Sequence, residues 1–357
     1  MDEQRLSDIL EHFSTARILV AGDFFLDQYL VLDAELTEKS LETGLEAYQV
    51  VAKRLYPGAA GTVTSNLKAL DAGVVLALGV IGVDGEGFEL KRGLNATGVD
   101  TELLIECCER FTPTYTKPML RSQGSEEELN RIDIKNRSPL PLEVEQRVIA
   151  ALRDRVRMVD AVIVADQVQE RNCGVITDGV RTELASLAAE YPATIFIADS
   201  RARIGEFRNL WIKPNKFEAY RAVHGREAAE VGLAEAITAG TELKQRSHKP
   251  VFITMGEKGI LVVTDDHIYH VPTLHHTEPI DIVGAGDSVM AGIALALCSG
   301  ASPVEAAIIG NLVASITVQQ IGVTGTATRA QVLQRFREYG DYFLPTLVTD
   351  TSCSTSE

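Results

Sequence analysis

The sequence predicts an α/β fold in three layers: a central, mostly parallel sheet with helices on both faces, plus a small inserted β-sheet that serves as a lid. Short apolar runs, such as residues 16–21 and 161–165, are typical of strands buried in a parallel sheet. These runs alternate with helical segments, and that alternation places helices on both faces of the sheet. The 357 residues, 45% of them hydrophobic, are enough for one large core.

Core strands and helices are expected along the whole chain, each bounded by turn or polar residues. Apolar runs predict core strands at residues 16–21, 74–82, 161–165, 194–198, 210–213, 250–254 and 259–264. Helical patterns lie at residues 62–71, 87–97, 142–159, 175–190, 217–223, 285–298 and 303–320. Gly73 is expected to end the first helix. Ser302, Pro303 and Glu305 form a capping box at the start of the last helix.

Two segments, 28–52 and 111–136, are expected to form the lid. The first mixes polar residues with β-forming ones, and the second alternates with period two around Gly124, as in a hairpin. We expect four strands whose exposed edges need covering, so we predict a homodimer built through the lid. No linker interrupts the remaining sequence. It predicts a single domain over residues 1–340 and a partly disordered tail over residues 341–357.

Charge and composition narrow the partners and the compartment. The net charge of -16 argues against a nucleic-acid partner, because phosphates require a basic surface. The polar, acidic start of the chain is no signal peptide, and no apolar run is long enough to cross a bilayer. Five cysteines without C-x-x-C spacing predict a reducing, cytoplasmic location. An anionic substrate would be met by local basic residues, for which the candidates are Lys117, Arg121, Arg131 and Lys135.

Residues 281–288 combine a glycine turn, a carboxylate and the start of an apolar helix. Gly284, Ala285 and Gly286 form the turn, and Asp287 follows it directly. A helix N-terminus presents unpaired amides that suit a phosphate or a developing oxyanion. A carboxylate repels an anion, so we interpret Asp287 as a general base beside a phosphate site. The alternative is an ordinary turn that opens a helix; a dinucleotide fingerprint fails because Val289 stands where its third glycine belongs.

This octapeptide resembles the C-terminal signature of the ribokinase-like (PfkB) carbohydrate kinases, and further motifs of that family follow in order over about residues 16–330. They are Gly22-Asp23 with Asp27, the glycine segment 57–63, the segment 79–87, and Asn215-Lys216-Phe217-Glu218. Within the family, Lys117 and residues 129–133 look most like the bacterial heptose-7-phosphate kinases. The resemblance implies a ribokinase-like fold and ATP-dependent transfer of the γ-phosphate to a hydroxyl of a sugar or sugar phosphate, such as a heptose 7-phosphate.

The resemblance also implies roles for individual residues. Asp287 would be the base, and the amides of Gly284, Ala285, Gly286 and Asp287 the anion hole. ATP and Mg²⁺ are the expected cofactors. Asn215 and Glu218 would hold Mg²⁺ through water, while Thr254, Gly256 and Asn311 would contact the nucleotide. Asp281 could hold a monovalent cation such as K⁺, or act as a structural cap, and Asn215 could equally be an N-cap.

The expected acceptor is a small sugar or sugar phosphate. Asp27 follows a buried strand and can accept two hydroxyl hydrogen bonds. The other residues expected near the acceptor are Gly58, Thr62, Lys117, Arg131, Asp133 and Asp166.

Two departures from the family pattern affect this prediction. Ala59 and Thr62 stand where the family usually has a second glycine and an asparagine. Residues 166–169 read Asp-Gln-Val-Gln, where the heptose kinases have Asp-Tyr-x-Lys. We therefore expect an active kinase with a shifted substrate. The alternatives are a non-catalytic sugar or nucleotide sensor on the same fold, and a nucleoside kinase.

Overall fold

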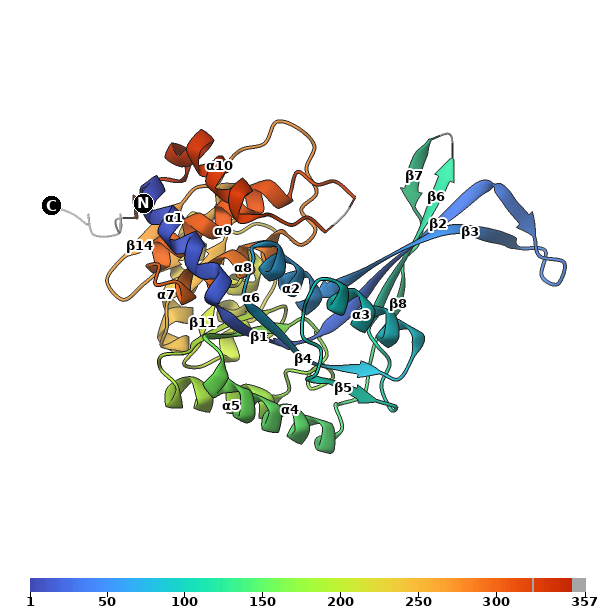
Figure 1. Cartoon of the computed structure of the whole chain (residues 1–357), viewed down its shortest axis with the longest axis horizontal. Helices are drawn as coiled ribbons and strands as arrows, with labels where there is room; N and C mark the ends of the chain where they lie inside the picture. Colours follow the sequence, from blue (N-terminus) through green and yellow to red (C-terminus); the bar gives the residue numbers. More distant parts are fainter. Residues whose placement is uncertain (123, 323, 349–357) are drawn as a thin grey trace.

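The computed structural model describes residues 1–122, 124–322 and 324–348, and its main body is a three-layer α/β assembly from which a second sheet projects (Figure 1). The main sheet has ten strands in the order β15-β14-β13-β12-β11-β10-β9-β1-β4-β5. From β5 to β12 neighbouring strands are parallel. At the other side of the sheet β13, β14 and β15 follow β12 in antiparallel pairing. The predicted fold class is confirmed.

The main body is built from the following elements. The strands of the main sheet are β1 Arg17–Gly22, β4 Val74–Gly82, β5 Leu104–Cys107, β9 Ala161–Asp166, β10 Ile195–Ser200, β11 Trp211–Ile212, β12 Val251–Thr254, β13 Ile260–Val263, β14 Ile268–Val271 and β15 Thr346–Leu347. The α-helices are α1 Glu3–His12, α2 Ala60–Ala69, α3 Gly85–Ala96, α4 Leu142–Arg155, α5 Asp178–Glu190, α6 Lys216–His224, α7 Leu233–Ser247, α8 Ala285–Cys298, α9 Pro303–Thr317 and α10 Arg329–Tyr339. Short 3₁₀ turns are η1 Phe13–Thr15, η2 Val156–Met158, η3 Ile204–Glu206, η4 Gly256–Lys258 and η5 Gly340–Phe343.

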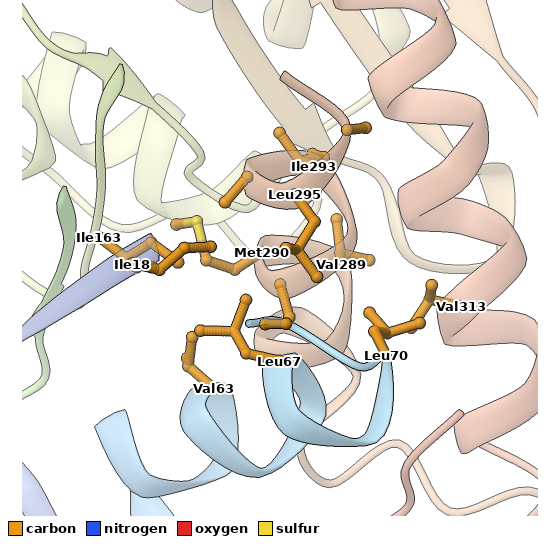
Figure 2. Packing of buried hydrophobic residues seen from close by; sticks show 14 of the residues in the cluster. Ile18, Val63, Leu67, Leu70, Ile163, Val289, Met290, Ile293, Leu295 and Val313 are labelled. Carbon is orange, nitrogen blue, oxygen red and sulfur yellow. The ribbon is translucent and has the colours of Figure 1, made fainter. Parts of the chain in front are cut away.

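Two hydrophobic cores lie on opposite faces of the main sheet. One contains side chains of α1, α2, α3, α8, α9 and α10, and the other contains side chains of α4, α5, α6 and α7. Figure 2 shows Val63 and Leu67 of α2 packed beside Met290 of α8, next to Ile18 of the sheet. Burying a side chain of this size contributes roughly 1.5–3 kcal/mol. This packing holds α2 and α8 together.

The strand order reverses at β1, because the chain goes from β1 to β4 on one side and later reaches β9 on the other. Both neighbours are parallel to β1. In an open α/β sheet the crevice beyond the carboxyl ends of the strands at such a point is the usual ligand site. The segments that follow β1, β9 and β10 therefore converge where the sequence places its polar strand ends.

The lid is larger than predicted. It has five strands, β2 Phe24–Lys39, β3 Glu46–Ala59, β6 Thr114–Ser122, β7 Ser125–Glu128 and β8 Ile132–Ile134. The β2–β3 ribbon extends far from the main body in Figure 1. The expected hairpin is present as β6 and β7, and the segment after it returns as β8 to pair with the start of β6.

Several predicted boundaries need correction. The helix expected to end at Gly73 already ends at Ala69, and Asp71 supplies the positive φ of 67°. The pattern analysis missed α1, α7, α10, β5 and β14. Strand β15 belongs to the main sheet although its residues were assigned to the tail, and residues 349–357 of that tail lie outside the described residues. The described part of the chain has no helix with the length and apolar character needed to cross a membrane.

Candidate functional site

A cleft of about 440 Å³ lies between the lid and the main body. Its walls come from β2, β6, the segments after β9 and β10, and the turn before α8. Of the residues predicted from the sequence, those lining it are Asp27, Thr62, Lys117, Arg131, Lys135, Gly284 and Asp287. These residues lie far apart in sequence, and the fold brings them to one cavity.

The turn before α8 leaves backbone amides facing outward from the helix start. Gly284 has a φ of 78°, a value that favours glycine, and α8 begins at the next residue. The Ala285 amide donates to the Ile282 carbonyl oxygen at 3.1 Å, so the turn itself uses one donor of the predicted anion hole. Among the described residues, we find no protein acceptor for the amides of Gly284, Gly286 and Asp287. Three of the four predicted donors are thus available to an anion.

The carboxyl group of Asp287 is partly buried and lines the cleft. Burial and the negative charge of Asp199 raise its pKa to about 7, while Lys213 and Arg201 oppose that rise. Within the described ranges, no basic side chain comes within salt-bridge distance of this carboxylate. A group with this pKa can take up a proton near neutral pH, as a general base must.

A buried ion pair lies beneath the turn. The Lys213 Nζ atom is 2.8 Å from Asp199 Oδ2. It is also 3.7 Å from the point that a Cβ atom on Gly286 would occupy. Burial lowers the pKa of Lys213, but the pair with Asp199 outweighs that effect and the pKa is raised. The sequence analysis missed this lysine, although it directly precedes Pro214 and Asn215 at a strand end.

Asn215 and Glu218 form a capping box at the start of α6. Asn215 Oδ1 accepts from the amides of Phe217 and Glu218 at 2.9 Å, and Glu218 Oε2 accepts from the Asn215 amide at 2.8 Å. The capping alternative for Asn215 therefore describes its present contacts. Burial and Asp199 raise the pKa of Glu218 to about 7. Its Oε1 atom is 3.8 Å from Arg201 Nη1.

The residues predicted to contact the nucleotide separate into two groups. Thr254 pairs with Asn215 through a parallel β-bridge, and Gly256 follows it with a φ of 64°, so these lie at the same end of the sheet. Asn311 is buried on α9, and its Nδ2 atom donates to the carbonyl oxygens of Val271 and Pro272 at 3.0 Å. The Asn311 side chain therefore holds the end of β14, which is a structural role.

Asp281 joins two turns. Its carboxylate accepts from the amides of Val283 at 3.0 Å and Gly322 at 3.2 Å. This is the cap interpretation of Asp281. In the described residues, no group of three or more His, Cys, Asp and Glu side chains is arranged to hold a metal ion.

Gly58 leaves the space that the Asp27 carboxylate occupies. A Cβ atom on Gly58 would lie 2.5 Å from Asp27 Oδ2, so only glycine lets the carboxylate take this position. Burial raises the pKa of Asp27, and the charges of Lys117 and Arg131 lower it. Asp27 is thus a hydrogen-bond acceptor at the cleft with two cations nearby.

The cations of the lid already have partners. Lys117 Nζ donates to the Tyr29 hydroxyl at 3.0 Å. Arg131 makes a double hydrogen bond to Asp133, at 2.6 and 2.9 Å. Asp133, predicted to lie near the acceptor, does not line the cleft but orients Arg131.

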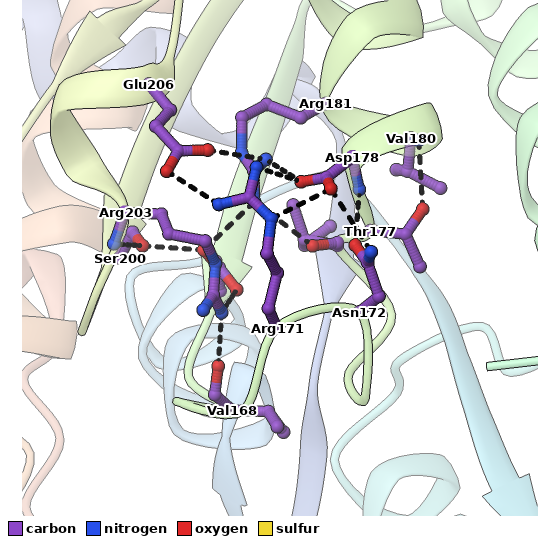
Figure 3. A network of polar contacts seen from close by, with 12 residues as sticks. Val168, Arg171, Asn172, Thr177, Asp178, Val180, Arg181, Ser200, Arg203 and Glu206 are labelled. Carbon is purple, nitrogen blue, oxygen red and sulfur yellow. Dashed lines mark hydrogen bonds and ion pairs between the residues drawn. The ribbon is translucent and has the colours of Figure 1, made fainter. Parts of the chain in front are cut away.

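Asp166, predicted to lie near the acceptor, does not line the cleft. It is buried, and its carboxylate accepts from Ser200 Oγ at 2.6 Å and from Arg203 Nη2 at 3.1 Å. Figure 3 shows the surrounding network, in which Arg203 also donates to the carbonyl oxygen of Val168. On the other side of the same loop, the Asp23 carboxylate accepts from three backbone amides, those of Gln167, Val168 and Val175. Both carboxylates shape the cleft wall at 167–170, and neither lines the cleft itself.

The sequence is similar to a family model and to curated bacterial proteins. A family model described as "pfkB family carbohydrate kinase" matches residues 206–329. The chain is 30% identical over 335 residues to the Bifunctional protein HldE of Trichlorobacter lovleyi, covering 93% of this chain and 65% of that protein. It is 31% identical to the protein of the same name from Pelobacter propionicus, covering 93% and 66%. The chain thus spans about two thirds of the length of these curated relatives.

Solved structures share the architecture. Arabidopsis thaliana ribokinase, complexed with ribose and ATP, has a TM-score of 0.65 at 17% identity, covering 90% of this chain and 99% of that one. Phosphofructokinase-2 from Escherichia coli, in complex with potassium, has a TM-score of 0.67 at 17% identity, covering 91% and 99%. At this identity the likeness concerns the fold, and the expected ribokinase-like architecture is confirmed.

Proposed function

Because the chain belongs to the PfkB family of carbohydrate kinases, we propose that it transfers the γ-phosphate of ATP to a hydroxyl group of a sugar or sugar phosphate. One observation carries the proposal: the Asp287 carboxylate, whose pKa is raised, lies in the cleft beside the helix-start amides of Gly286 and Asp287, and neither it nor these amides has a partner among the described residues. Asp27 lies in the same cleft and can accept a hydrogen bond from a hydroxyl group of the substrate. These groups are what phosphoryl transfer to an alcohol requires.

In the proposed reaction the acceptor hydroxyl loses its proton to Asp287 as its oxygen forms a bond to the γ-phosphorus. The bond from phosphorus to the oxygen that bridges it to ADP breaks, and ADP leaves with that electron pair. The amides of Gly286 and Asp287 stabilise charge on the phosphoryl oxygens, and losing one such donor typically lowers a rate by about 10²–10³. Lys213 supports the same region with positive charge from below the turn.

The donor set fits Mg²⁺ held mainly through water. A hard cation of this kind takes one or two carboxylates and keeps several waters. Glu218 has one oxygen committed to the capping box, which leaves Oε1 for such a role. When bound, the ion would neutralise phosphate charge. We expect Glu218→Gln to raise the Mg²⁺ concentration needed for half-maximal rate. For K⁺, Asp281 is the candidate, and a rate that is equal in Na⁺ and K⁺ would count against it.

A phosphorylated acceptor is favoured over a neutral one. Lys117, Arg131 and Lys135 all line the cleft on its lid side, in a chain whose net charge is -16. Such a local concentration of cations attracts an anionic substrate against the overall field. A heptose 7-phosphate is therefore the first compound to test.

The test is a coupled ATP-consumption screen over neutral sugars, sugar phosphates and nucleosides, with Asp287→Asn beside the wild type. Loss of a general base typically lowers the rate by about 10²–10⁴. Asp266→Asn serves as the control, because Asp266 is exposed on the turn between β13 and β14, away from the cleft. A wild type that consumes no ATP with any acceptor would support the sensor alternative. Undiminished activity in Asp287→Asn would refute the base assignment.

We further propose that the lid forms a homodimer. Tyr48 and Val50 of β3 are exposed and two residues apart, so they point to the same face of the ribbon. Exposed apolar side chains on a long ribbon usually mark an interface. Light scattering should give the mass of a dimer for the wild type and of a monomer for a Tyr48→Asp/Val50→Asp double variant. A monomeric wild type would refute the proposal.

A further inference from the structure

Arg201 is a cleft residue that the sequence analysis passed over. It directly follows β10, and its backbone is fixed on both sides. Its amide donates to the Asp166 carbonyl oxygen at 3.0 Å, and its own carbonyl oxygen accepts from the Arg221 guanidinium. The side chain lines the cleft together with Gly284 and Asp287. A rigid backbone thus carries a long cationic side chain to the reaction site.

The guanidinium group lies among the groups that would handle phosphate. Arg201 Nε donates to Gln167 Oε1 at 3.0 Å, which orients the planar group. Its Nη1 atom is 3.8 Å from Glu218 Oε1. Its positive charge also lowers the pKa of both Glu218 and Asp287. Arg201 therefore lies next to Glu218, the expected metal residue, and lines the same cleft as the expected base Asp287.

The contacts of the Arg201 side chain contribute little to the stability of the fold. Its side chain is 57% exposed, and an exposed pair at 3.8 Å contributes between about 0 and 1 kcal/mol. The neighbouring cations are different. Lys213 is buried against Asp199, and Arg203 is buried against Asp166. Arg201 is the cation at this place that is most available to a ligand.

We infer that Arg201 is a catalytic residue whose guanidinium binds the phosphoryl group during its transfer. The inference rests on the proposed function and adds to it a side-chain donor opposite the helix-start amides. In the transition state, negative charge spreads over the three equatorial oxygens of the phosphoryl group. A guanidinium meets two such oxygens with parallel hydrogen bonds. Arg201 neither gains nor loses a proton in this step.

The test compares Arg201→Ala and Arg201→Lys with the wild type. We expect Arg201→Ala to lower kcat by about 10²–10³, the usual effect of removing one transition-state donor. The affinity for ATP should change less than about fivefold, and the affinity for ADP with tetrafluoroaluminate should fall at least tenfold further. Arg201→Lys should recover only part of the rate, because lysine keeps the charge but not the fork. Added guanidinium should raise the rate of Arg201→Ala.

Arg153→Ala is the matched control. Arg153 is 64% exposed and makes a double hydrogen bond to Glu183, at 2.6 and 2.8 Å, but it does not line the cleft. It should lose stability without losing rate. The inference is overturned if Arg201→Ala keeps kcat within threefold of the wild type, or if only the KM for the acceptor changes.

Failure of the proposed function would be distinguishable. A wild type that phosphorylates no acceptor would end that proposal. The binding comparison would still decide the role of Arg201, since equal affinities of wild type and Arg201→Ala for the ADP–tetrafluoroaluminate complex would overturn it.

Discussion

Ala59 has a backbone conformation that suits glycine, and replacing it tests whether the cleft stores strain. Its φ is 54° and its ψ is -117°, which is the region of the first central residue of a type II′ turn. The conformation is imposed from both sides. Ala59 pairs with Phe24 at the end of β3, and the next amide, that of Ala60, donates to the Asp23 carbonyl oxygen at 3.0 Å.

We expect Ala59→Gly to stabilise the protein. A non-glycine residue in such a region costs on the order of 1–3 kcal/mol. Glycine removes this strain, but it also increases the conformational entropy of the unfolded chain, which lowers the free energy of unfolding by roughly 0.5–1 kcal/mol. The net gain is therefore about 1 kcal/mol. With an unfolding entropy of about 2 cal/mol/K per residue over 357 residues, this corresponds to a rise of about 1–2 °C in Tm.

The assay is scanning calorimetry of three proteins side by side: wild type, Ala59→Gly and the control Ala60→Gly. Ala60 is buried in the first turn of α2, so glycine there should lower stability by about 1 kcal/mol. Opposite shifts from adjacent alanines would identify backbone strain at position 59. If Ala59→Gly unfolds at or below the Tm of the wild type, the strain argument is wrong. Because the Ala59 methyl group lines the cleft, we also expect a changed KM for the acceptor.

Further outcomes follow from the buried carboxyl groups. Because the pKa of Asp287 is raised to about 7, kcat/KM should fall tenfold per pH unit below about 7 and level off above it, as measured in a pH–rate profile. The same group releases its proton near pH 4 in the unfolded chain, so its own contribution to the stability of the wild type should be lost as pH rises from about 4 to 7. Asp287→Asn cannot titrate there and should exceed the wild type by about 1–2 kcal/mol at pH 8 but not at pH 4, in urea unfolding; equal curves at both values would contradict this. Asp23→Asn should cost about 2–4 kcal/mol, because one amide oxygen cannot serve three donors and its NH₂ group opposes them, and an unchanged unfolding midpoint would count against that reasoning.

Local signals in the sequence predicted local structure well. The bounds 285–298 of α8 and the capping box of Ser302 and Glu305 agree with the structure, because a glycine turn and a cap act within a few residues. Helix α1 was missed because only Leu6, Ile9 and Leu10 mark its buried face. The predicted lid began too late in the sequence because β2 starts at Phe24, with only one residue between it and the end of β1, and its first residues are as buried as those of a core strand.

Long-range contacts explain what sequence reasoning could not supply. It placed polar residues at the ends of strands, and Asp27 and Asp287 do line one cleft. Asn311 donates to a carbonyl oxygen of β14, and Asp133 accepts from Arg131 within the lid. Whether either side chain faces a ligand depends on these contacts. Neither spacing nor composition encodes these partners. Lys213 and Arg201 were not predicted for the same reason, since no sequence pattern indicates the position of the charged group at the end of a long side chain.

The carboxylates at the strand ends illustrate how neighbours decide chemistry. Asp166 forms an ion pair with Arg203 at 3.1 Å, and Asp199 forms one with Lys213 at 2.8 Å, with little exposure of either pair. Each of these two carboxylates therefore has a cationic side chain as its direct partner, while burial raises the pKa of Asp166. Asp287 has no such partner within the described ranges, and burial together with the negative charge of Asp199 raises its pKa to about 7. Asp287 is therefore a cleft-lining carboxylate that has a pKa near neutral pH and no basic partner in the described residues, as a general base requires.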